Sequence, residues 1–194
     1  MAARARDLAV TLVLGLALGA CAGPTGNGDD NAASALESRS LNERLADQRI
    51  RSAIMAELLS DEELRHESNI SVTVFDGIVL LTGEVPDREA GQRMARLARD
   101  ESDARHVFNE LVIAQLSSVF SRTRDRMLVG RAATRLLPLD DPETLDRARF
   151  HIVAERQRLY LMGRVTREEA EAITEEVRRI SGVREVVRLF EYLE

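Results

Sequence analysis

The chain contains little of what builds cross-links or aromatic binding platforms. Of its 194 residues one is cysteine, none is tryptophan, and aromatic residues make up 4%. A single cysteine excludes an intrachain disulfide, and the scarcity of large rings argues against a surface on which bases or sugars stack. Lysine is absent as well: all 27 basic residues are arginine, and the formal net charge is −6. A net acidic chain does not predict a nucleic-acid-binding protein.

Motifs of common catalytic and metal centres are also missing from the sequence. The three histidines, His66, His106 and His151, lie far apart and do not have the spacing of metal ligands. There is no Gly-x-Ser-x-Gly segment and no phosphate-binding loop. The acidic clusters at 61–63 and 140–143 lack the spacing of a calcium-binding loop. We therefore expect a protein that is not an enzyme and that uses neither a cofactor nor a metal.

What is present is a motif that occurs twice. Residues 79–85, VLLTGEV, return as residues 159–165, LYLMGRV. In each copy alternating apolar residues indicate a strand, and a glycine, a charged residue and a valine follow. Each copy then leads into a segment rich in Arg, Glu and Ala with a helical pattern, at 86–100 and 166–180. The repeat predicts one small unit that has been duplicated.

The first unit is expected to follow the order helix, strand, strand, helix, strand. Its elements are predicted at 41–59, 70–74, 78–85, 86–100 and 106–113. The helical pattern slips by one residue near Asp47, so the first helix is predicted to start either at the beginning of its range or at that slip. Asp76-Gly77 predicts a two-residue type I′ hairpin turn, in which both residues have positive φ. Gly83 is expected to let a helix approach its strand closely, and Val107, Leu111 and Ile113 are expected on one face of the last strand.

The second unit repeats this order. Its elements are predicted at 127–137, 150–154, 159–165, 166–180 and 186–192. Asp141 is expected to cap a short helix whose first residue is Pro142. The hairpin at 155–158 contains no glycine, so its turn type is left open. Gly163 repeats the glycine of the first strand motif, and Gly182 is expected at the C′ position of the second helix.

The first 20 residues have the pattern of a secretory signal peptide. Two arginines precede an apolar run at 8–18 that is too short to span a bilayer, and small residues follow. Leu18-Gly19-Ala20-Cys21 resembles a bacterial lipobox, which implies cleavage before Cys21 and attachment of lipid to it. By the sorting rules of that motif, Ala22 in the next position favours the outer membrane. The alternative is an ordinary signal peptide with an incidental cysteine.

Both repeated units resemble the BON domain. The resemblance rests on VTVFDGIVLLTGEV at 72–85 and on the segment at 159–194. The second copy follows the family's order of an apolar strand, Gly-x-Val, a helix, Gly-Val and a final strand. In the first copy the segment 102–104, Ser-Asp-Ala, stands where the family has Gly-Val, which suggests a different exit from the helix. The resemblance implies an α+β fold.

The expected organisation is two tandem αββαβ (BON) domains, at 45–115 and 120–194. A signal peptide at 1–20 precedes them, and a flexible tether at 21–40, rich in Gly, Asn and Asp, begins with the lipidated cysteine. One αββαβ unit buries only a small core and is marginal alone, so packing of the two copies would stabilise both.

Together with the lipobox, the repeats resemble the dual-BON-domain outer-membrane lipoproteins, a group that includes lipid-binding proteins associated with division and outer-membrane stress. The resemblance implies a non-enzymatic cell-envelope protein, anchored by Cys21 at the periplasmic face of the outer membrane, that binds phospholipid and supports outer-membrane integrity. A second interpretation stays open, in which the chain is a periplasmic adaptor that binds an envelope protein partner without recognising lipid. Neither interpretation involves nucleic acid.

One arginine-rich segment is the candidate site for anionic phospholipid. Its residues are Arg122, Arg124, Arg126, Arg131 and Arg135, and between residues 120 and 135 only Asp125 opposes them. Each such charge contributes about 1 kcal/mol near an anionic leaflet, and the resemblance implies that the second BON domain contacts such lipid. The alternative is a solvated helix face whose arginines reflect codon bias. Against lipid contact, the other helix of this domain carries five glutamates, which would repel it: Glu168, Glu169, Glu171, Glu175 and Glu176.

Overall fold

The computed structural model describes residues 40–100, 102–116, 119–139 and 145–193. These residues belong to a compact unit that spans 37–194. The expected signal peptide, Cys21, the tether and the expected cap at Asp141 lie outside the described residues. Among the helices that are described, none is long and apolar enough to cross a membrane.

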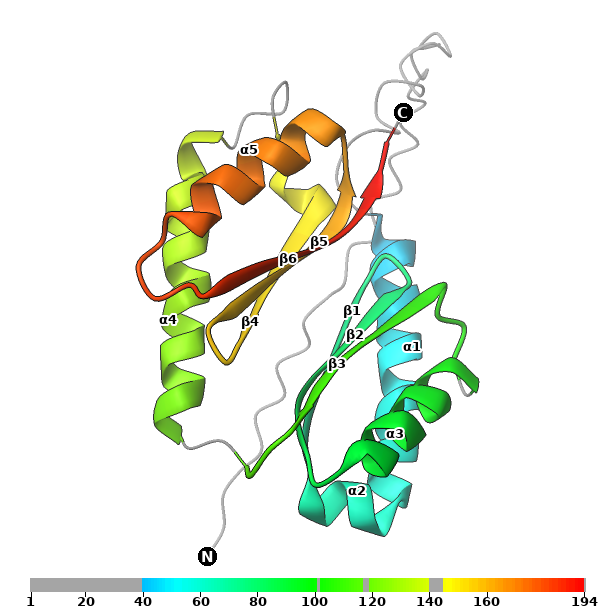
Figure 1. Cartoon of the computed structure of the whole chain (residues 1–194). Coiled ribbons are helices and arrows are strands. Elements are labelled where there is room, and N and C mark those ends of the chain that lie inside the picture. Colours follow the sequence, from blue (N-terminus) through cyan, green and yellow to red (C-terminus); the bar gives the residue numbers. More distant parts are fainter. Residues whose placement is uncertain (1–39, 101, 117–118, 140–144, 194) are drawn as a thin grey trace, which may run out of the picture. The chain divides into compact units, whose positions relative to one another are not determined.

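The described elements repeat one arrangement (Figure 1). The first copy consists of α1 (Leu41–Ser60), α2 (Glu62–Glu67), β1 (Asn69–Phe75), β2 (Ile78–Val85), α3 (Arg88–Asp100) and β3 (His106–Ile113). The second consists of α4 (Val119–Leu136), the 3-10 turns η2 (Leu137–Leu139) and η3 (Arg147–Arg149), β4 (Phe150–Glu155), β5 (Arg158–Val165), α5 (Arg167–Arg178) and β6 (Glu185–Tyr192). In each copy the middle strand pairs antiparallel with the first strand and parallel with the third. The predicted α+β class with a duplicated unit is confirmed.

The first helix of the first copy begins at the earlier of its two predicted starts, and that of the second copy begins before its predicted start. α1 starts at Leu41 because Ser40 forms a capping box with Glu43, in which the Ser40 N–H donates to Glu43 Oε2 at 2.7 Å. α4 starts at Val119, so its predicted start at 127 is wrong. Asp47 in α1 and Asp125 in α4 interrupt the apolar stripe without ending the helix. Each carboxylate is buried and accepts hydrogen bonds from a hairpin turn.

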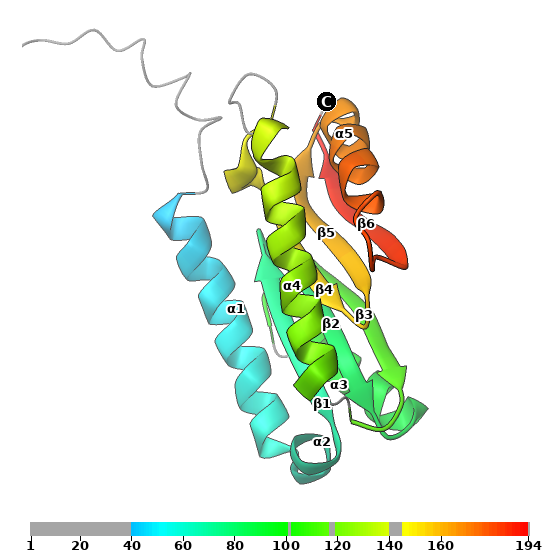
Figure 2. The same ribbon diagram turned by 90° about the vertical axis from the view of Figure 1, so that its left-hand side faces the viewer.

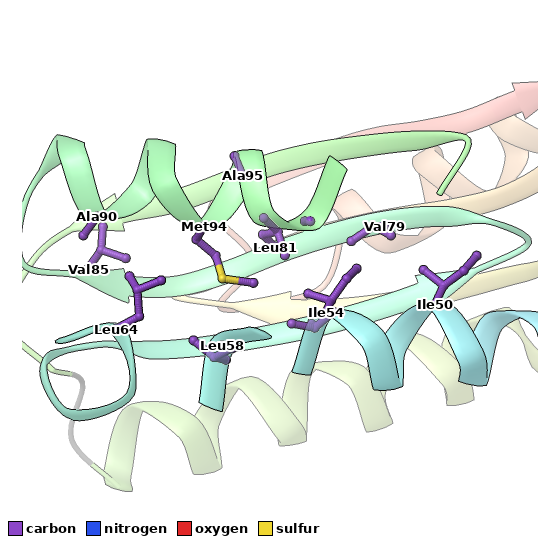
Figure 3. Packing of buried hydrophobic residues seen from close by; sticks show 12 residues of the cluster. Ile50, Ile54, Leu58, Leu64, Val79, Leu81, Val85, Ala90, Met94 and Ala95 are labelled. Carbon is purple, nitrogen blue, oxygen red and sulfur yellow. The ribbon is translucent and has the colours of Figure 1, made fainter. Parts of the chain in front are cut away.

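The core of the first copy lies between its helices and one face of its sheet (Figure 3). Ile54 from α1, Leu81 from β2 and Met94 from α3 are fully buried there. Burying such a side chain contributes about 1.5–3 kcal/mol relative to leaving it exposed. Of the three β3 residues predicted to share one face, Val107 and Leu111 pack against this core, whereas Ile113, the last residue of the strand, is 61% exposed. A second core of the same kind forms around α4, β5 and α5.

The middle strands are buried on both faces, which the sequence pattern did not indicate. Ile78 and Leu80 of β2 form a third hydrophobic cluster with Tyr160 and Met162 of β5, and Leu189 of β6 belongs to the same cluster. These are the alternate residues of each strand, which point away from that copy's own helices. The two sheets therefore share a hydrophobic cluster, as expected for units too small to be stable alone.

The glycines of the repeated motif are required by a neighbouring strand and not by a helix. Gly83 has φ +114°, and a Cβ atom there would overlap the carbonyl oxygen of Asn69 on β1. Gly163 has φ +144°, and its added Cβ would lie 2.6 Å from Cα of Phe150 on β4. The prediction of close helix approach at Gly83 is thus wrong. Gly182 is not at C′ either: α5 ends at Arg178, and the residue with φ +96° follows in a separate turn.

Candidate functional site

The structure divides the five candidate arginines into two groups along α4, which lies in front of the second sheet in Figure 2. All five side chains are exposed. Within the described part of the chain, Arg124 and Arg126 form no ion pair. Arg131 donates from Nη1 to the Ser181 carbonyl oxygen at 3.1 Å, and Arg135 Nε lies 2.6 Å from Glu176 Oε2. The first group is open to solvent, whereas Arg131 and Arg135 contact the end of α5.

The one acid among these arginines does not lie on their surface. Asp125 is 4% exposed, and its carboxylate accepts the backbone N–H groups of Arg156 and Gln157 at 3.0 and 2.9 Å. In the sequence, Asp125 reads as a charge that opposes the arginines. The buried carboxylate instead holds the β4–β5 hairpin turn, so it does not offset the arginines at the exposed face of α4.

Asp47 has the equivalent position and role in the first copy. Its buried carboxylate accepts the backbone N–H groups of Asp76 and Gly77 at 2.9 and 2.8 Å. The signal in the sequence was the slip of the helical pattern at Asp47, which we interpreted as a helix boundary. An acidic residue that breaks an apolar stripe at the same place in two repeats indicates a buried acceptor.

Both hairpin turns have the same backbone. Asp76 and Gly77 have φ of 52° and 71°, which confirms the predicted type I′ turn. Arg156 and Gln157, whose turn type was left open, have φ of 51° and 66°. Positive φ is unfavourable for residues that have a Cβ atom. The two hydrogen bonds that the turn N–H groups donate to Asp125 therefore stabilise a turn that Arg156 and Gln157 do not favour by themselves.

Fewer of the α5 glutamates form an exposed acidic surface than the sequence predicted. Glu169 is buried, pairs with Arg149 and accepts the Thr166 N–H at 2.7 Å. The prediction that it belongs to an acidic surface is therefore wrong, because it caps the start of α5. Glu175 lies 2.8 Å from Arg178, so part of the expected repulsion toward an anionic surface is neutralised within the helix. Glu168 and Glu171 remain exposed.

A cluster of carboxylates lies where the β4–β5 turn meets β2. Glu84 has no exposed surface, accepts from Asn69 Nδ2 at 2.8 Å and pairs with Arg156 Nη1 at 3.1 Å. Burial, together with the carboxylates of Glu84 and Asp125, raises the pKa of Glu155 to about 7, against the lowering effect of Arg156 and Arg122. Among the described residues, Glu155 Oε1 is buried without a hydrogen-bond partner. No spacing in the sequence indicates this cluster, because only the fold brings its residues together.

No group of three or more His, Cys, Asp or Glu side chains that could hold a metal ion occurs among the described residues. His151 stacks on Phe75, with 5.9 Å between ring centroids and 12° between ring planes. This ring pair belongs to the contact between the two sheets and is not a ligand set.

The chain is 24% identical over 190 residues to the outer membrane lipoprotein DolP of Haemophilus influenzae, covering 97% of both chains. It is 22% identical over 159 residues to the 21 kDa hemolysin of Actinobacillus pleuropneumoniae, covering 82% of this chain and 80% of that one.

The solved C-terminal domain of CdsD, a structural protein of the type III secretion system of Chlamydia trachomatis, is 14% identical. The match covers 81% of this chain and 70% of that one with a TM-score of 0.30, which is too low to support an argument. The BON domain family matches residues 46–115 and 135–194. The second segment begins at 135, so most of α4 lies outside it. These two segments make up more than half of the chain, and each contains one of the three-stranded sheets, so the chain belongs to the BON-domain family.

Proposed function

We propose that this chain is a lipid-anchored, non-enzymatic protein of the cell envelope that binds anionic phospholipid through α4 and supports outer-membrane integrity. Its anchor is Cys21, which places it at the periplasmic face of the outer membrane. The name of the relative in Haemophilus influenzae, an outer membrane lipoprotein matched over 97% of both chains, supports this location. The lipobox at 18–21 supports the anchor.

The observation that carries lipid binding is the exposed arginine surface at the start of α4. Arg122, Arg124 and Arg126 are exposed, and the acid among them is buried in the opposite direction. Arg124 and Arg126 form no ion pair among the described residues, so their guanidinium donors are open to phosphate oxygens. An anionic leaflet attracts each such charge by about 1 kcal/mol, so the three arginines together contribute about 3 kcal/mol toward binding.

Co-sedimentation with vesicles tests the proposal. A fragment of residues 22–194 retains every described element, because those elements lie in the compact unit 37–194. We expect it to bind anionic vesicles and not zwitterionic ones, with binding that weakens as salt rises. Arg124→Gln/Arg126→Gln removes two charges, or about 2 kcal/mol, which lowers affinity for anionic vesicles about 30-fold.

The matched control is Arg49→Gln/Arg51→Gln, which removes two exposed arginines from α1, the equivalent helix of the first copy. It changes net charge equally and should leave most of the binding. Equal losses in the two variants would mean that net charge, and not α4, attracts the vesicles. No binding to either kind of vesicle would overturn lipid recognition and leave the protein-binding adaptor as the interpretation to test.

A further inference from the structure

A cleft of about 380 Å³ lies between the two sheets, at the end where β2 and β3 finish and β5 and β6 begin. Its volume is within the range of about 300–1,000 Å³ that is usual for ligand pockets. Val112 from β3, Tyr160 from β5 and Arg184, which directly precedes β6, all line it. The cleft therefore takes its walls from both copies of the unit.

The duplication gives residues of this cleft a counterpart in the other copy. Because β2 pairs with β3 as β5 pairs with β6, the register makes Val112 equivalent to Glu191. Arg184 is equivalent to Arg105, since each donates its backbone N–H to the carbonyl oxygen of the second residue of its own hairpin turn, at 2.9 and 2.8 Å. The two ends of the contact between the sheets can therefore be compared position by position.

Exchange of the two copies relates the ion pairs at these two ends. At one end Arg164 Nε lies 3.6 Å from Asp76 Oδ2. At the other end Arg156 Nη1 lies 3.1 Å from Glu84 Oε1. These are equivalent positions with the signs of charge reversed, because the register aligns position 76 with 156 and position 84 with 164. The approximate twofold relation therefore holds for side-chain contacts as well as for strands.

One contact between the copies has no counterpart. Arg105 Nη1 lies 2.9 Å from Glu191 Oε2. At the other end Arg184 and Val112 line the cleft, and valine supplies no carboxylate. Within the described part of the chain the exposed Arg184 side chain forms no ion pair, so its planar set of donors is open to a carboxylate. A cleft with an open guanidinium group thus stands where the other end has an ion pair.

A second polar group of the cleft is without a partner. Glu155 lines it, and among the described residues its buried Oε1 has no hydrogen-bond partner. Burial raises the pKa of this carboxyl group to about 7, together with Glu84 on β2 and Asp125 on α4. Arg156 and Arg122 act in the opposite direction. At pH 6 most Glu155 side chains therefore keep an O–H group that can donate.

The other acids of the cleft limit the charge of a ligand. Glu185 Oε2 lies 2.7 Å from Arg158 Nε, and Glu110 Oε2 lies 3.7 Å from Arg158 Nη1. Both carboxylates line the cleft, and one arginine serves both. A dianion would meet repulsion that this arginine does not offset, whereas a singly charged anion is matched by Arg184.

We propose that this cleft binds a singly charged carboxylate, held by Arg184 and by the carboxyl group of Glu155. The carboxylate takes the part that Glu191 has at the other end of the contact. Carbon atoms next to it cover Val112. Both a small free acid and the C-terminus of a peptide carry this group. The inference goes beyond the proposed function and does not depend on it, because no residue of the arginine surface lines the cleft.

The test is a titration of residues 22–194 with N-acetyl-dialanine at pH 6, followed by NMR shifts of the backbone amides that line the cleft. We expect saturable shifts, and binding at least about tenfold weaker in Arg184→Gln, which loses donors to a charged group. The control Arg188→Gln removes an exposed arginine of β6 that does not line the cleft, and should leave binding unchanged. Equal effects of the two variants, or equal binding of the probe and its C-terminal amide, would overturn the proposal.

A substitution that copies the other end should close the site. Val112→Glu places a carboxylate at the position equivalent to Glu191. It should pair with Arg184 and weaken binding of the probe at least about tenfold. Val112→Thr keeps the branched shape of valine without a charge, so it should still bind. Unchanged binding in a folded Val112→Glu variant would overturn the proposal, and the comparison of Arg184→Gln with Arg188→Gln decides it independently of folding at position 112.

The pH dependence of binding tests the contact with Glu155. The probe stays ionised between pH 6 and pH 8, whereas Glu155 loses its proton as the pH passes about 7. Binding should weaken about five- to tenfold over this interval, because a donor becomes a second negative charge. Glu155→Gln keeps a donor at both pH values and should remove this dependence. The same dependence in both proteins would overturn the contact with Glu155.

Butyrate distinguishes the two sources of the carboxylate. Binding as tight as that of N-acetyl-dialanine supports a small free acid, and binding at least about tenfold weaker supports a peptide C-terminus. Arg124→Gln/Arg126→Gln changes the proposed lipid surface and should leave binding of both probes unchanged. A loss of binding in that variant would show that net charge, and not the cleft, attracts the carboxylate.

Discussion

Glu155→Gln should stabilise the protein at pH 8 and change its stability little at pH 5. Burial, with the carboxylates of Glu84 and Asp125, raises the pKa of Glu155 from 4.5 to about 7. Arg156 and Arg122 oppose this rise but do not cancel it. At pH 8 the folded protein therefore contains an unfavourable charge that glutamine, of the same shape, removes.

The sign follows from the two protonation equilibria. The folded protein keeps the Glu155 proton up to about pH 7, whereas the unfolded chain releases it near pH 4.5. Between these values the folded state binds more protons, so the free energy of unfolding falls as pH rises. Moving a pKa over this interval corresponds to about 3 kcal/mol. The side chain is only partly buried, and screening by solvent reduces the expected gain at pH 8 to about 1–2 kcal/mol.

Urea unfolding of residues 22–194, followed by circular dichroism at pH 5 and pH 8, measures this difference. Glu171→Gln is the control, because it removes an exposed carboxylate of the second copy and should change stability by less than about 0.5 kcal/mol at either pH. A loss of stability in Glu155→Gln at pH 8, or the same gain at both pH values, would refute the reasoning.

Two further predictions concern backbone geometry, and urea unfolding measures both. Gly83→Ala should lower the free energy of unfolding by more than about 3 kcal/mol, because its Cβ atom would overlap the backbone of a paired strand. The control, Gly130→Ala, should raise it by about 0.5–1 kcal/mol, because alanine favours a helix more than glycine does. Similar effects of the two variants would contradict the close approach of Gly83 to β1. Gln157→Gly should stabilise the β4–β5 turn by about 1 kcal/mol, whereas Asp125→Ala should cost about 1–3 kcal/mol by leaving two turn N–H groups unpaired. An unchanged Asp125→Ala variant would show that the turn holds its shape alone.

Local patterns predicted the elements and their order. Alternation of apolar residues at 70–74 and 78–85 marked two strands, and Asp76-Gly77 marked the turn between them, because these signals depend only on neighbouring residues. The repeat of the glycine motif predicted the duplication. All five candidate arginines of α4 are exposed, as charged side chains usually are, and their role in lipid binding stays a prediction.

The remaining features depend on residues far apart in the chain. Gly83 is required by Asn69 and not by a helix, which no spacing in the strand motif can show. Asp47 and Asp125 appeared as a helix boundary and a surface charge, because their partners are the turn N–H groups 29 to 32 positions later. A buried acceptor and a solvated acid look alike in sequence.

The sequence by itself determined a duplicated αββαβ chain with an arginine-rich helix, because periodicity and turn chemistry act over a few residues. Only the tertiary structure decided which arginines are open to solvent and which contact α5. Only the fold brings Glu84, Glu155 and Arg156 into one cluster, and it buries the second faces of β2 and β5. These features depend on how the two sheets and their helices pack, because packing brings together residues that are far apart in the chain.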